Sequence, residues 1–392
     1  MKFFFLLLFP MMAWAQEYPY YTAPEGFEET SGTRKEISPN TPIKAQDGIG
    51  VCYGFSATSL LEHYRCKELA LNCNDPRERL SSLDVTSYYQ KGELEEGGNA
   101  FRIFSNLEQM KNPRIALEEC AKFSDLVYRI NMGNYSYTEE EKNGWNLLAQ
   151  KWNEYKGIGI TRNDCVNCLV ESIKKELTNL QTPAEQIREA FVNARDLNDF
   201  LYRSILPKKC LSPEETVSIP KFKPNNFPLY NEKLTPESLN KKIQSLLLSD
   251  IPVEMGICTQ PLEDKTKCAH GSAHSVALFG IKEVCQGRDC RAMVKVKNSY
   301  GMSWQRQFDD GWIDLNTLVE SSIVLTKFQN ISWLERPGFV LKERVLRTVS
   351  AKPSSSNSGG LPSQYKDHKG IWKCPGAKYV QNYEEGCVPY KP

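Results

Sequence analysis

The chain has 392 residues, of which 40% are hydrophobic and 25% are charged. This length and composition allow a large buried core, which excludes disorder throughout and predicts a globular protein of about two domains. The 49 basic and 48 acidic residues nearly balance. The chain therefore has no basic field for nucleic acid or anionic lipid, and we expect no nucleic-acid partner.

The first residues predict an export signal. Lys2 precedes an apolar run from Phe3 to Ala13, and Ala13-Trp14-Ala15 has the pattern of a signal-peptidase site. The run is shorter than the about 20 residues of a membrane-spanning helix, and no later stretch is long and apolar enough. We expect residues 1-15 to be a cleaved signal peptide and the mature chain to be exported, to an extracellular, periplasmic or lumenal compartment, with no membrane span.

The next segment carries a candidate nucleophile. Residues 16-40 are polar and predict an extended stretch that wraps the domain, and the following segment, 41-56, reads TPIKAQDGIGVCYGFS. Cys52 opens an apolar helical run, and a helix N-terminus would stabilise a thiolate and lower the thiol pKa from about 8.5. The carboxamide of Gln46 and the backbone N–H of Cys52 could both donate to one oxyanion. The alternative is that Cys52 is one half of a disulfide.

Helical patterns fill the middle of the chain. Thr138 and Thr182 each begin a capping box, the second with Pro183 at the first helical position, and Thr235 begins a helix that stops before Ile251. Their apolar stripes, which we interpret as core, include Trp145, Leu148, Trp152, Tyr155, Ile187, Phe191, Ala194, Leu197 and Leu201.

Two predicted strands carry the complementary groups. His274 begins the run HSVALFGI, which predicts a buried strand, while 292-297 alternates valine with lysine and predicts a half-exposed one. Asn298 follows the second strand, so it could accept a hydrogen bond from the His274 ring and orient it. His63 lies on the helix of Cys52, roughly 16 Å away at 1.5 Å per residue, and cannot reach the thiol.

These segments together resemble the papain-like cysteine peptidases. The resemblance rests on Gln46 and Cys52 at their spacing, followed by an aromatic residue, a small residue, Phe and Ser, and on His274 with the later NSYGMSW run. It covers about 41-101 and 236-315. The sequence departs from the family pattern at Ile49, Val51, Tyr53 and Tyr300, and Tyr300 stands where a tryptophan usually shields the bond between histidine and asparagine.

The resemblance implies a fold and a set of roles. The fold is α+β, with a helical subdomain that carries Cys52 and a β-rich subdomain that carries His274 and Asn298 across one cleft. Cys52 is implied as nucleophile, His274 as base, Asn298 as its orienting group and Gln46 as oxyanion donor. Gly97 and Gly98 match a glycine pair along which a substrate backbone lies; the alternative is an ordinary loop pair. No metal and no organic cofactor are implied.

The resemblance and the composition together predict the domain organisation. We expect a catalytic domain at 16-345 with a helical insertion at about 125-235, and a Ser- and Pro-rich linker with a small cysteine-containing tail at 346-392. The stretch before Cys52 leaves no room for the family's long inhibitory propeptide. The predicted function is that of an exported, monomeric thiol-dependent peptidase acting on peptides or proteins. The alternative is a secreted binding protein on a catalytically retired scaffold.

The 13 cysteines test this interpretation. If Cys52 stays free as nucleophile, the other twelve could close six bridges in an oxidising compartment, although an odd cysteine could equally form an intermolecular bond. The CxxC at Cys165 and Cys168 also fits a redox or zinc motif, but no second ligand pair accompanies it. Proximity favours the pairs Cys258 with Cys268, Cys285 with Cys290, and Cys374 with Cys387.

Overall fold

The computed structural model describes residues 22-23, 25-46, 49-89, 98-126, 143-158, 163-229, 232-259, 262, 273-323 and 331-346, and the backbone of four later strands. The chain divides into two compact units, of which the larger is Tyr20–Val349 and the smaller includes Ser350–Pro392. In the smaller unit two antiparallel pairs form, β11 (Tyr365–Lys366) with β12 (Trp372–Lys373) and β13 (Tyr379–Asn382) with β14 (Gly386–Pro389).

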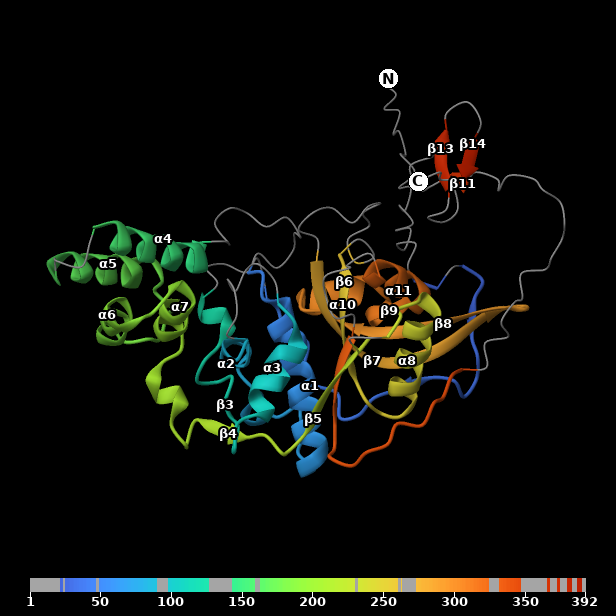
Figure 1. Cartoon of the computed structure of the whole chain (residues 1–392), viewed down its shortest axis with the longest axis horizontal. Coiled ribbons are helices and arrows are strands. Elements are labelled where there is room, and N and C mark those ends of the chain that lie inside the picture. The colour runs from blue at the N-terminus through green and yellow to red at the C-terminus, as the bar shows by residue number, and fades with distance from the viewer. Residues whose placement is uncertain are drawn as a thin grey trace, which may run out of the picture. The chain divides into compact units, whose positions relative to one another are not determined.

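An eight-stranded antiparallel sheet lies in the larger unit (Figure 1). Its main path runs through β5 (Lys223–Phe227), β10 (Ile331–Glu335), β6 (Val253–Cys258), β7 (Ala273–Gln286), β8 (Asp289–Lys297) and β9 (Trp312–Asp314). Two short strands, β1 (Glu28–Glu29) and β2 (Lys35–Glu36), pair with the outer half of β7. The prediction that the N-terminal segment lies extended against the domain is confirmed for its described residues.

The two strands that carry the candidate site are buried along most of their length. β7 is buried from His274 to Val284, and β8 is buried at Lys297 as well as at its valines. Strands with apolar residues at successive positions are covered on both faces. The prediction of a half-exposed strand is therefore wrong for β8, because Thr41 of the N-terminal segment covers Lys297.

Two helices pack together in this β-rich part, and the first begins where the sequence predicts. α8 (Pro236–Leu248) starts with a capping box in which Thr235 and Ser238 each accept from the other's backbone N–H. α11 (Leu315–Ile323) packs against α8 and β6. The remaining helices around the sheet are α10 (Gly301–Gln307) and the 3₁₀ turn Asp309–Gly311.

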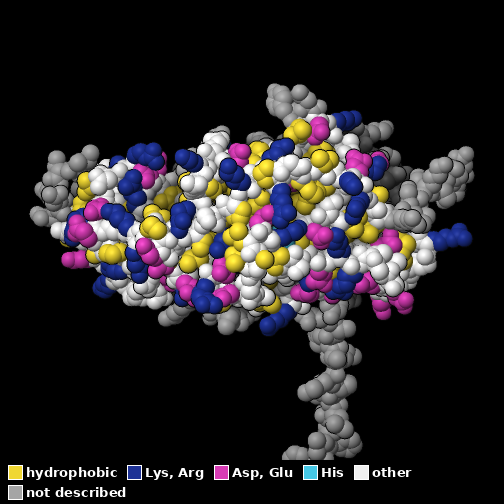
Figure 2. All heavy atoms as spheres, turned by 90° about the horizontal axis from the view of Figure 1, so that it is seen from below, with side chains coloured by type: hydrophobic (Ala, Val, Ile, Leu, Met, Phe, Trp, Pro, Cys, Tyr) yellow, Lys and Arg dark blue, Asp and Glu magenta, His cyan; other side chains and the backbone are white. Residues whose placement is uncertain are grey.

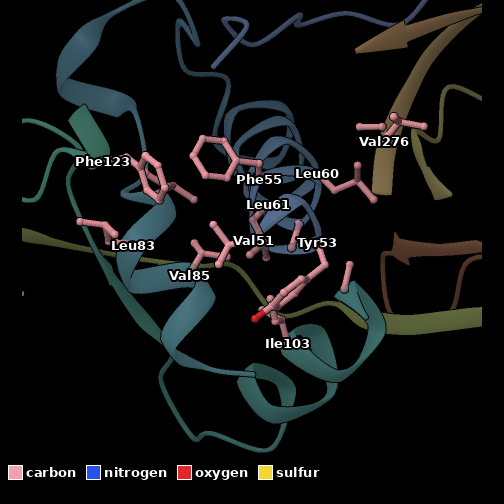
Figure 3. Packing of buried hydrophobic residues seen from close by; sticks show 14 of the residues in the cluster. Val51, Tyr53, Phe55, Leu60, Leu61, Leu83, Val85, Ile103, Phe123 and Val276 are labelled. Atoms are coloured by element: carbon pink, nitrogen blue, oxygen red, sulfur yellow. The ribbon is translucent and has the colours of Figure 1, made fainter. Parts of the chain in front are cut away.

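The central helix of the helical part is α1 (Cys52–Leu69), whose residues from Cys52 to Cys66 are all buried. A helix that is covered all round belongs to the core. Figure 3 shows Tyr53, Phe55, Leu60 and Leu61 of α1 packed among side chains of the surrounding elements. Those elements are α2 (Ser82–Ser87), α3 (Ala100–Glu108), β6, β7 and β10, and the 3₁₀ turn Phe123–Leu126, whose Phe123 ring lies against Phe55. A further 3₁₀ turn, Pro76–Glu78, has no buried residue.

The predicted insertion forms four helices that lie together beyond α1, α2 and α3 (Figure 1). They are α4 (Asn143–Ile158), α5 (Asn163–Glu176), α6 (Ala184–Asn193) and α7 (Leu197–Ile205). Their apolar stripes form core as predicted, and the rings of Trp152 and Phe200 stack with centroids 4.9 Å apart. After the four helices come the 3₁₀ turn Lys208–Leu211 and β4 (Thr216–Ser218), which pairs with β3 (Arg114–Ala116).

One predicted helix start in the insertion is wrong. Pro183 is the N-cap of α6, no side chain caps the helix, and the hydroxyl of Thr182 is buried without a partner among the described residues. Because proline holds an extended backbone here, with ψ 145°, the helix begins after it. The other predicted start, Thr138, lies outside the described residues.

The α+β class predicted from the sequence is confirmed by these two parts, a helical one around α1 and a β-rich one around β7. Basic and acidic side chains are interspersed over the face drawn in Figure 2. None of the described helices has the length and apolarity that crossing a membrane requires.

Candidate active site

Cys52 is the first residue of α1 and is a free, buried thiol with 8% of its surface exposed. The backbone N–H groups of Ser275 and of the helix start lie close enough to the sulfur to lower the pKa of the thiol. Ser275 directly follows His274 on β7. The thiol therefore lies against the beginning of the strand that carries the predicted base.

The prediction that the helix start lowers the pKa of Cys52 is wrong for the thiol without a positively charged neighbour. Burial raises the pKa of Cys52 to about 11, and the charge of Glu254 acts in the same direction. The backbone N–H groups lower the pKa by less. Formation of a thiolate near neutral pH therefore requires a positive neighbour, and His274 is the titratable group beside Ser275.

His274 and Asn298 meet as the sequence predicts. Nε2 of His274 lies 2.8 Å from Oδ1 of Asn298, and these residues are 6% and 1% exposed. The antiparallel register of β7 with β8, in which Ala277 faces Lys297, brings the two side chains together. Because Oδ1 can only accept, Nε2 donates to it, which leaves Nδ1 of a neutral ring free of its proton.

Tyr300 takes the position that the resemblance assigns to a tryptophan. Its ring lies 4.8 Å from the His274 ring, tilted by 35°, and it bridges to Ala45 of the N-terminal segment. The tyrosine thus covers the histidine with a smaller aromatic surface.

Gln46 is fixed on two sides. Its Nε2 donates to the carbonyl of Ile49 over 2.9 Å, and its Oε1 accepts from the hydroxyl of Ser299. The backbone N–H of Gln46 also donates to the carbonyl of Ser299 over 2.8 Å. The loop that carries Gln46 is therefore tied to the residue after Asn298.

The glycine pair is only half described. Gly97 lies outside the described residues. A Cβ on Gly98 would lie 2.5 Å from the ring of Tyr53, so a side chain there would displace the residue that follows Cys52. This close approach is a packing reason for glycine at position 98.

Of the other three histidines only His63 is described, and it is not part of the site. Nδ1 of His63 lies 2.8 Å from the carbonyl of Pro39, and burial lowers the pKa of His63 to about 4. His270 and His368 lie outside the described residues.

A small cavity lies behind the site, and it was not predicted from the sequence. It is lined by Lys44, Phe55, Ser56, Ser59, Ser275, Lys297, Asn298 and Ser299. Nδ2 of Asn298 is buried and has no hydrogen-bond partner among the described residues. Glu254 lies near this cavity, because its carboxyl accepts a hydrogen bond from Ser275. A single acidic residue within an apolar strand was the sequence feature that could have identified it.

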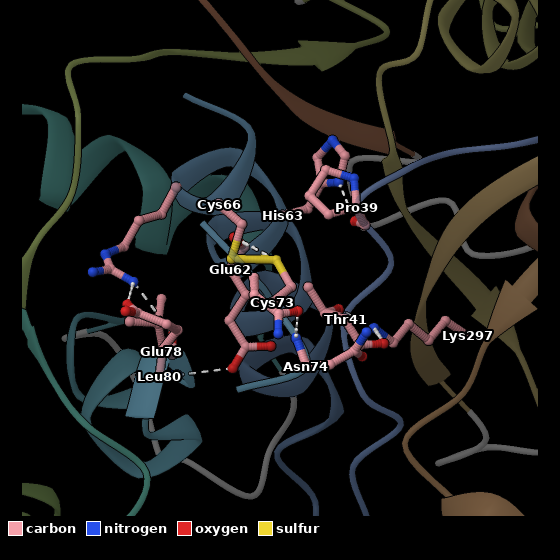
Figure 4. Close-up of a disulfide and its surroundings, with 12 residues drawn as sticks. Pro39, Thr41, Glu62, His63, Cys66, Cys73, Asn74, Glu78, Leu80 and Lys297 are labelled. Carbon is pink, nitrogen blue, oxygen red and sulfur yellow. Dashed lines mark hydrogen bonds and ion pairs between the residues drawn. A yellow bond between two sulfur atoms is a disulfide. The ribbon is translucent and has the colours of Figure 1, made fainter. Parts of the chain in front are cut away.

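The cysteines partly follow the prediction. Cys285 and Cys290 are bridged as predicted, and the pairs Cys66 with Cys73 (Figure 4) and Cys120 with Cys210 also form. Cys258 is bridged to a partner outside the described cysteines. The predicted pair Cys374 with Cys387 also lies outside the described side chains.

The expectation of six bridges is wrong at Cys165 and Cys168, which are both free thiols on α5. The described residues contain one cluster of possible metal ligands, Glu283 with Cys285 and Cys290. Its two cysteines form a disulfide, which removes the thiolates that a metal would bind.

No family model and no curated protein matches the sequence. Among solved structures, the chain is similar to the Amb a 11 cysteine protease, a ragweed pollen allergen, in its proform, with a TM-score of 0.38 and 15% identity. The similarity covers 75% of this chain and 61% of that one, so this chain spans less than two thirds of the proform.

The chain is also similar to the bromelain protease of Ananas comosus, with a TM-score of 0.36 and 13% identity over 75% of this chain and 93% of that one. Similarity at this level carries no argument for this chain. The described fold is α+β, with the thiol at the start of a central helix, His274 on the sheet and Asn298 directly after the neighbouring strand.

Proposed function

We propose that this chain is a thiol-dependent peptidase with Cys52, His274 and Asn298 as its catalytic residues. The observation that carries the proposal is the 2.8 Å bond from His274 to Asn298, on a strand whose next residue, Ser275, lies beside the Cys52 thiol and lowers its pKa. In the proposed mechanism the asparagine holds one ring nitrogen of His274, and the other acts on the thiol.

The chemistry follows from these positions. Nδ1 of His274 takes the proton of the Cys52 thiol, and the sulfur attacks the carbonyl carbon of a peptide bond. The carbonyl oxygen becomes an oxyanion, which the Cys52 N–H and the second N–H of the Gln46 amide stabilise. The imidazolium then protonates the leaving amine as the C–N bond breaks. Water, deprotonated by His274, hydrolyses the thioester and restores the thiol.

None of these steps calls for a metal or an organic cofactor. Peptides and proteins are the proposed substrate class, because a thiol paired with a histidine and an oxyanion donor suits attack on a peptide carbonyl. We also propose that residues 1-15 direct export and are removed. The disulfides of the described residues are compatible with an oxidising compartment.

A specific observation favours a second candidate. Cys52 and His274 are only 8% and 6% exposed, so a substrate carbonyl must gain access to a thiol that is mostly covered. This favours a binding protein on a catalytically retired scaffold.

A cleavage assay distinguishes the two candidates. Purified mature protein is incubated with a peptide library and, separately, with a thiol-directed epoxide, and the matched controls are Cys52→Ala and Cys168→Ala. The peptidase proposal expects cleavage and labelling of Cys52, both lost in Cys52→Ala and kept in Cys168→Ala. No cleavage together with no labelling of Cys52 would establish the binding protein.

A further inference from the structure

Glu254 is the only charged residue of β6, whose sequence is VEMGIC. The side chain is buried, with 4% of the residue exposed. None of the ion pairs formed by the described residues includes it, so it has hydroxyl partners in place of a cation. A buried carboxyl of this kind is costly to ionise.

Two serine hydroxyls satisfy its oxygens. Ser275 donates to Oε1 over 2.7 Å and Ser332 of β10 donates to Oε2 over 2.6 Å. The Ser275 hydroxyl also lies 2.5 Å from the hydroxyl of Ser56. The Ser56 hydroxyl also donates to the carbonyl of Tyr53 over 3.2 Å, so these hydroxyls connect Glu254 to the first turn of α1. Glu254 and the three serines are buried.

This chain of hydrogen bonds meets the candidate active site at two points. Ser56 lies four residues after Cys52 and so occupies the same face of α1, one turn further on. Ser275 follows His274, and its backbone N–H is near enough to the Cys52 sulfur to lower the pKa of the thiol. The carboxyl of Glu254 therefore holds the residue that links the base to the nucleophile.

We propose that Glu254 is a positioning residue for this site, which anchors Ser275 beneath Cys52 and whose charge sets how readily the thiol ionises. This inference rests on the proposed role of Cys52 as nucleophile. Glu254 is not among the site residues predicted from the sequence.

The protonation of Glu254 changes near neutral pH. Burial raises the pKa of Glu254 to about 7, and the hydroxyls of Ser332 and Ser275 lower it by less. Above that pH the ionised carboxylate raises the pKa of Cys52 and opposes formation of a thiolate. Below it the carboxyl is neutral, so the repulsion is lost and the thiol ionises more readily.

The elements that pack against β6 bring few other charges to this carboxyl. They are α1, α8, α11, β7 and β10. Cys52 comes from α1 and His274 from β7, whereas β10 brings the neutral hydroxyl of Ser332. Of the charged residues of the two remaining helices, Glu237 and Lys241 of α8 and Glu320 of α11 are exposed, and Lys242 of α8 is half-buried over the ring of Phe227.

The test measures the alkylation rate of Cys52 by iodoacetamide at pH 6 and pH 8, with peptide mapping by mass spectrometry. In Glu254→Gln the amide keeps the size of the carboxyl but carries no charge. We expect the ratio of the rate at pH 8 to that at pH 6 to exceed the wild-type ratio by roughly three- to tenfold, which corresponds to half a pKa unit to one unit.

The matched control is Glu283→Gln, which removes another buried carboxyl from the same sheet. Glu283 is roughly 30 Å further along β7 than His274, at 3.3 Å per residue, so the ratio should match the wild type. An unchanged ratio in Glu254→Gln, with Cys52 still labelled and peptides still cut, overturns this inference and leaves the proposed function intact. Failure to label Cys52 in the wild type overturns both.

A second variant keeps the inference testable if Glu254→Gln does not fold. Ser332→Ala removes one donor to the carboxylate without touching Ser275 or α1, so the pKa of Glu254 should rise. The pH above which Cys52 alkylation is suppressed should then move upward, with the conservative Ser332→Thr restoring the wild-type profile. A profile that does not move in Ser332→Ala overturns the inference.

Discussion

Lys297, the residue before Asn298, donates from its buried ammonium group to both the carbonyl and the hydroxyl of Thr41 (Figure 4). The contact ties the N-terminal segment to the end of β8. Nζ of Lys297 also lies 4.8 Å from the centroid of the Phe279 ring. Burial lowers the pKa of Lys297 from 10.5 to about 7, so the protonation of this contact depends on pH.

Lys297→Met should therefore change stability in a pH-dependent way. As pH falls from about 10.5 to about 7, the unfolded chain binds a proton that the folded lysine does not, so wild-type stability is lost over that range. The methionine variant has no such loss, and its stability relative to wild type should improve by a few kcal/mol between pH 10 and pH 7. Urea unfolding at several pH values measures this. A difference between the two proteins that stays constant with pH contradicts the prediction.

Gln46→Ala should reduce turnover by about 10²- to 10³-fold, the usual loss for one oxyanion donor. The measurement is kcat on the best peptide from the library assay, with Cys52 labelling as a check that the nucleophile is intact.

Ser299→Ala is the companion to this variant. It frees Oε1 of Gln46 but keeps the amide, so the loss should be smaller than in Gln46→Ala. A loss below threefold in Gln46→Ala, or a larger loss in Ser299→Ala, would show that the amide is not directed at the oxyanion.

The bridge between Cys120 and Cys210 should stabilise the fold more than the bridge between Cys285 and Cys290. The first spans 90 residues and closes the base of the helical insertion, whereas the second spans 5. Loop-closure entropy grows with the length of the closed loop, so replacing both cysteines by alanine should cost about 4–5 kcal/mol for the first and about 2 kcal/mol for the second. Denaturant unfolding of the two double variants checks the order, and equal losses would contradict it.

The sequence predicted the parts of the site that depend on local pattern. The order of Gln46, Cys52, His274 and Asn298 identified four side chains, and the structure brings His274 onto Asn298 and places the thiol beside Ser275. Strand and helix periodicity identified β7 and α8, because each has a long and consistent pattern.

The predictions that were wrong concern features that depend on tertiary contacts. Lys297 alternates with valine, which indicates an exposed face, yet Thr41 of a distant segment covers it. Counting cysteines predicted complete pairing, but Cys165 and Cys168 lie on the same helix, where no partner from the described residues reaches them. The thiol pKa was predicted from the helix start alone, whereas burial dominates it.

His274→Ala should slow the labelling of Cys52 near pH 6. Burial is the largest cause that raises the pKa of this thiol to about 11, so a thiolate at pH 6 depends on an imidazolium at His274. The free thiols Cys165 and Cys168 on α5 are not part of the site and serve as internal standards for the reagent in the same digest. We expect the label on Cys52, relative to these standards, to fall at least about tenfold in His274→Ala, because one pKa unit changes the thiolate fraction tenfold.

The difference in labelling between the two proteins should become smaller as pH rises towards 10, where the thiol begins to ionise without an imidazolium. Equal labelling of Cys52 in both proteins at pH 6 would mean that His274 does not activate the thiol, and the catalytic pair would then have to be reassigned.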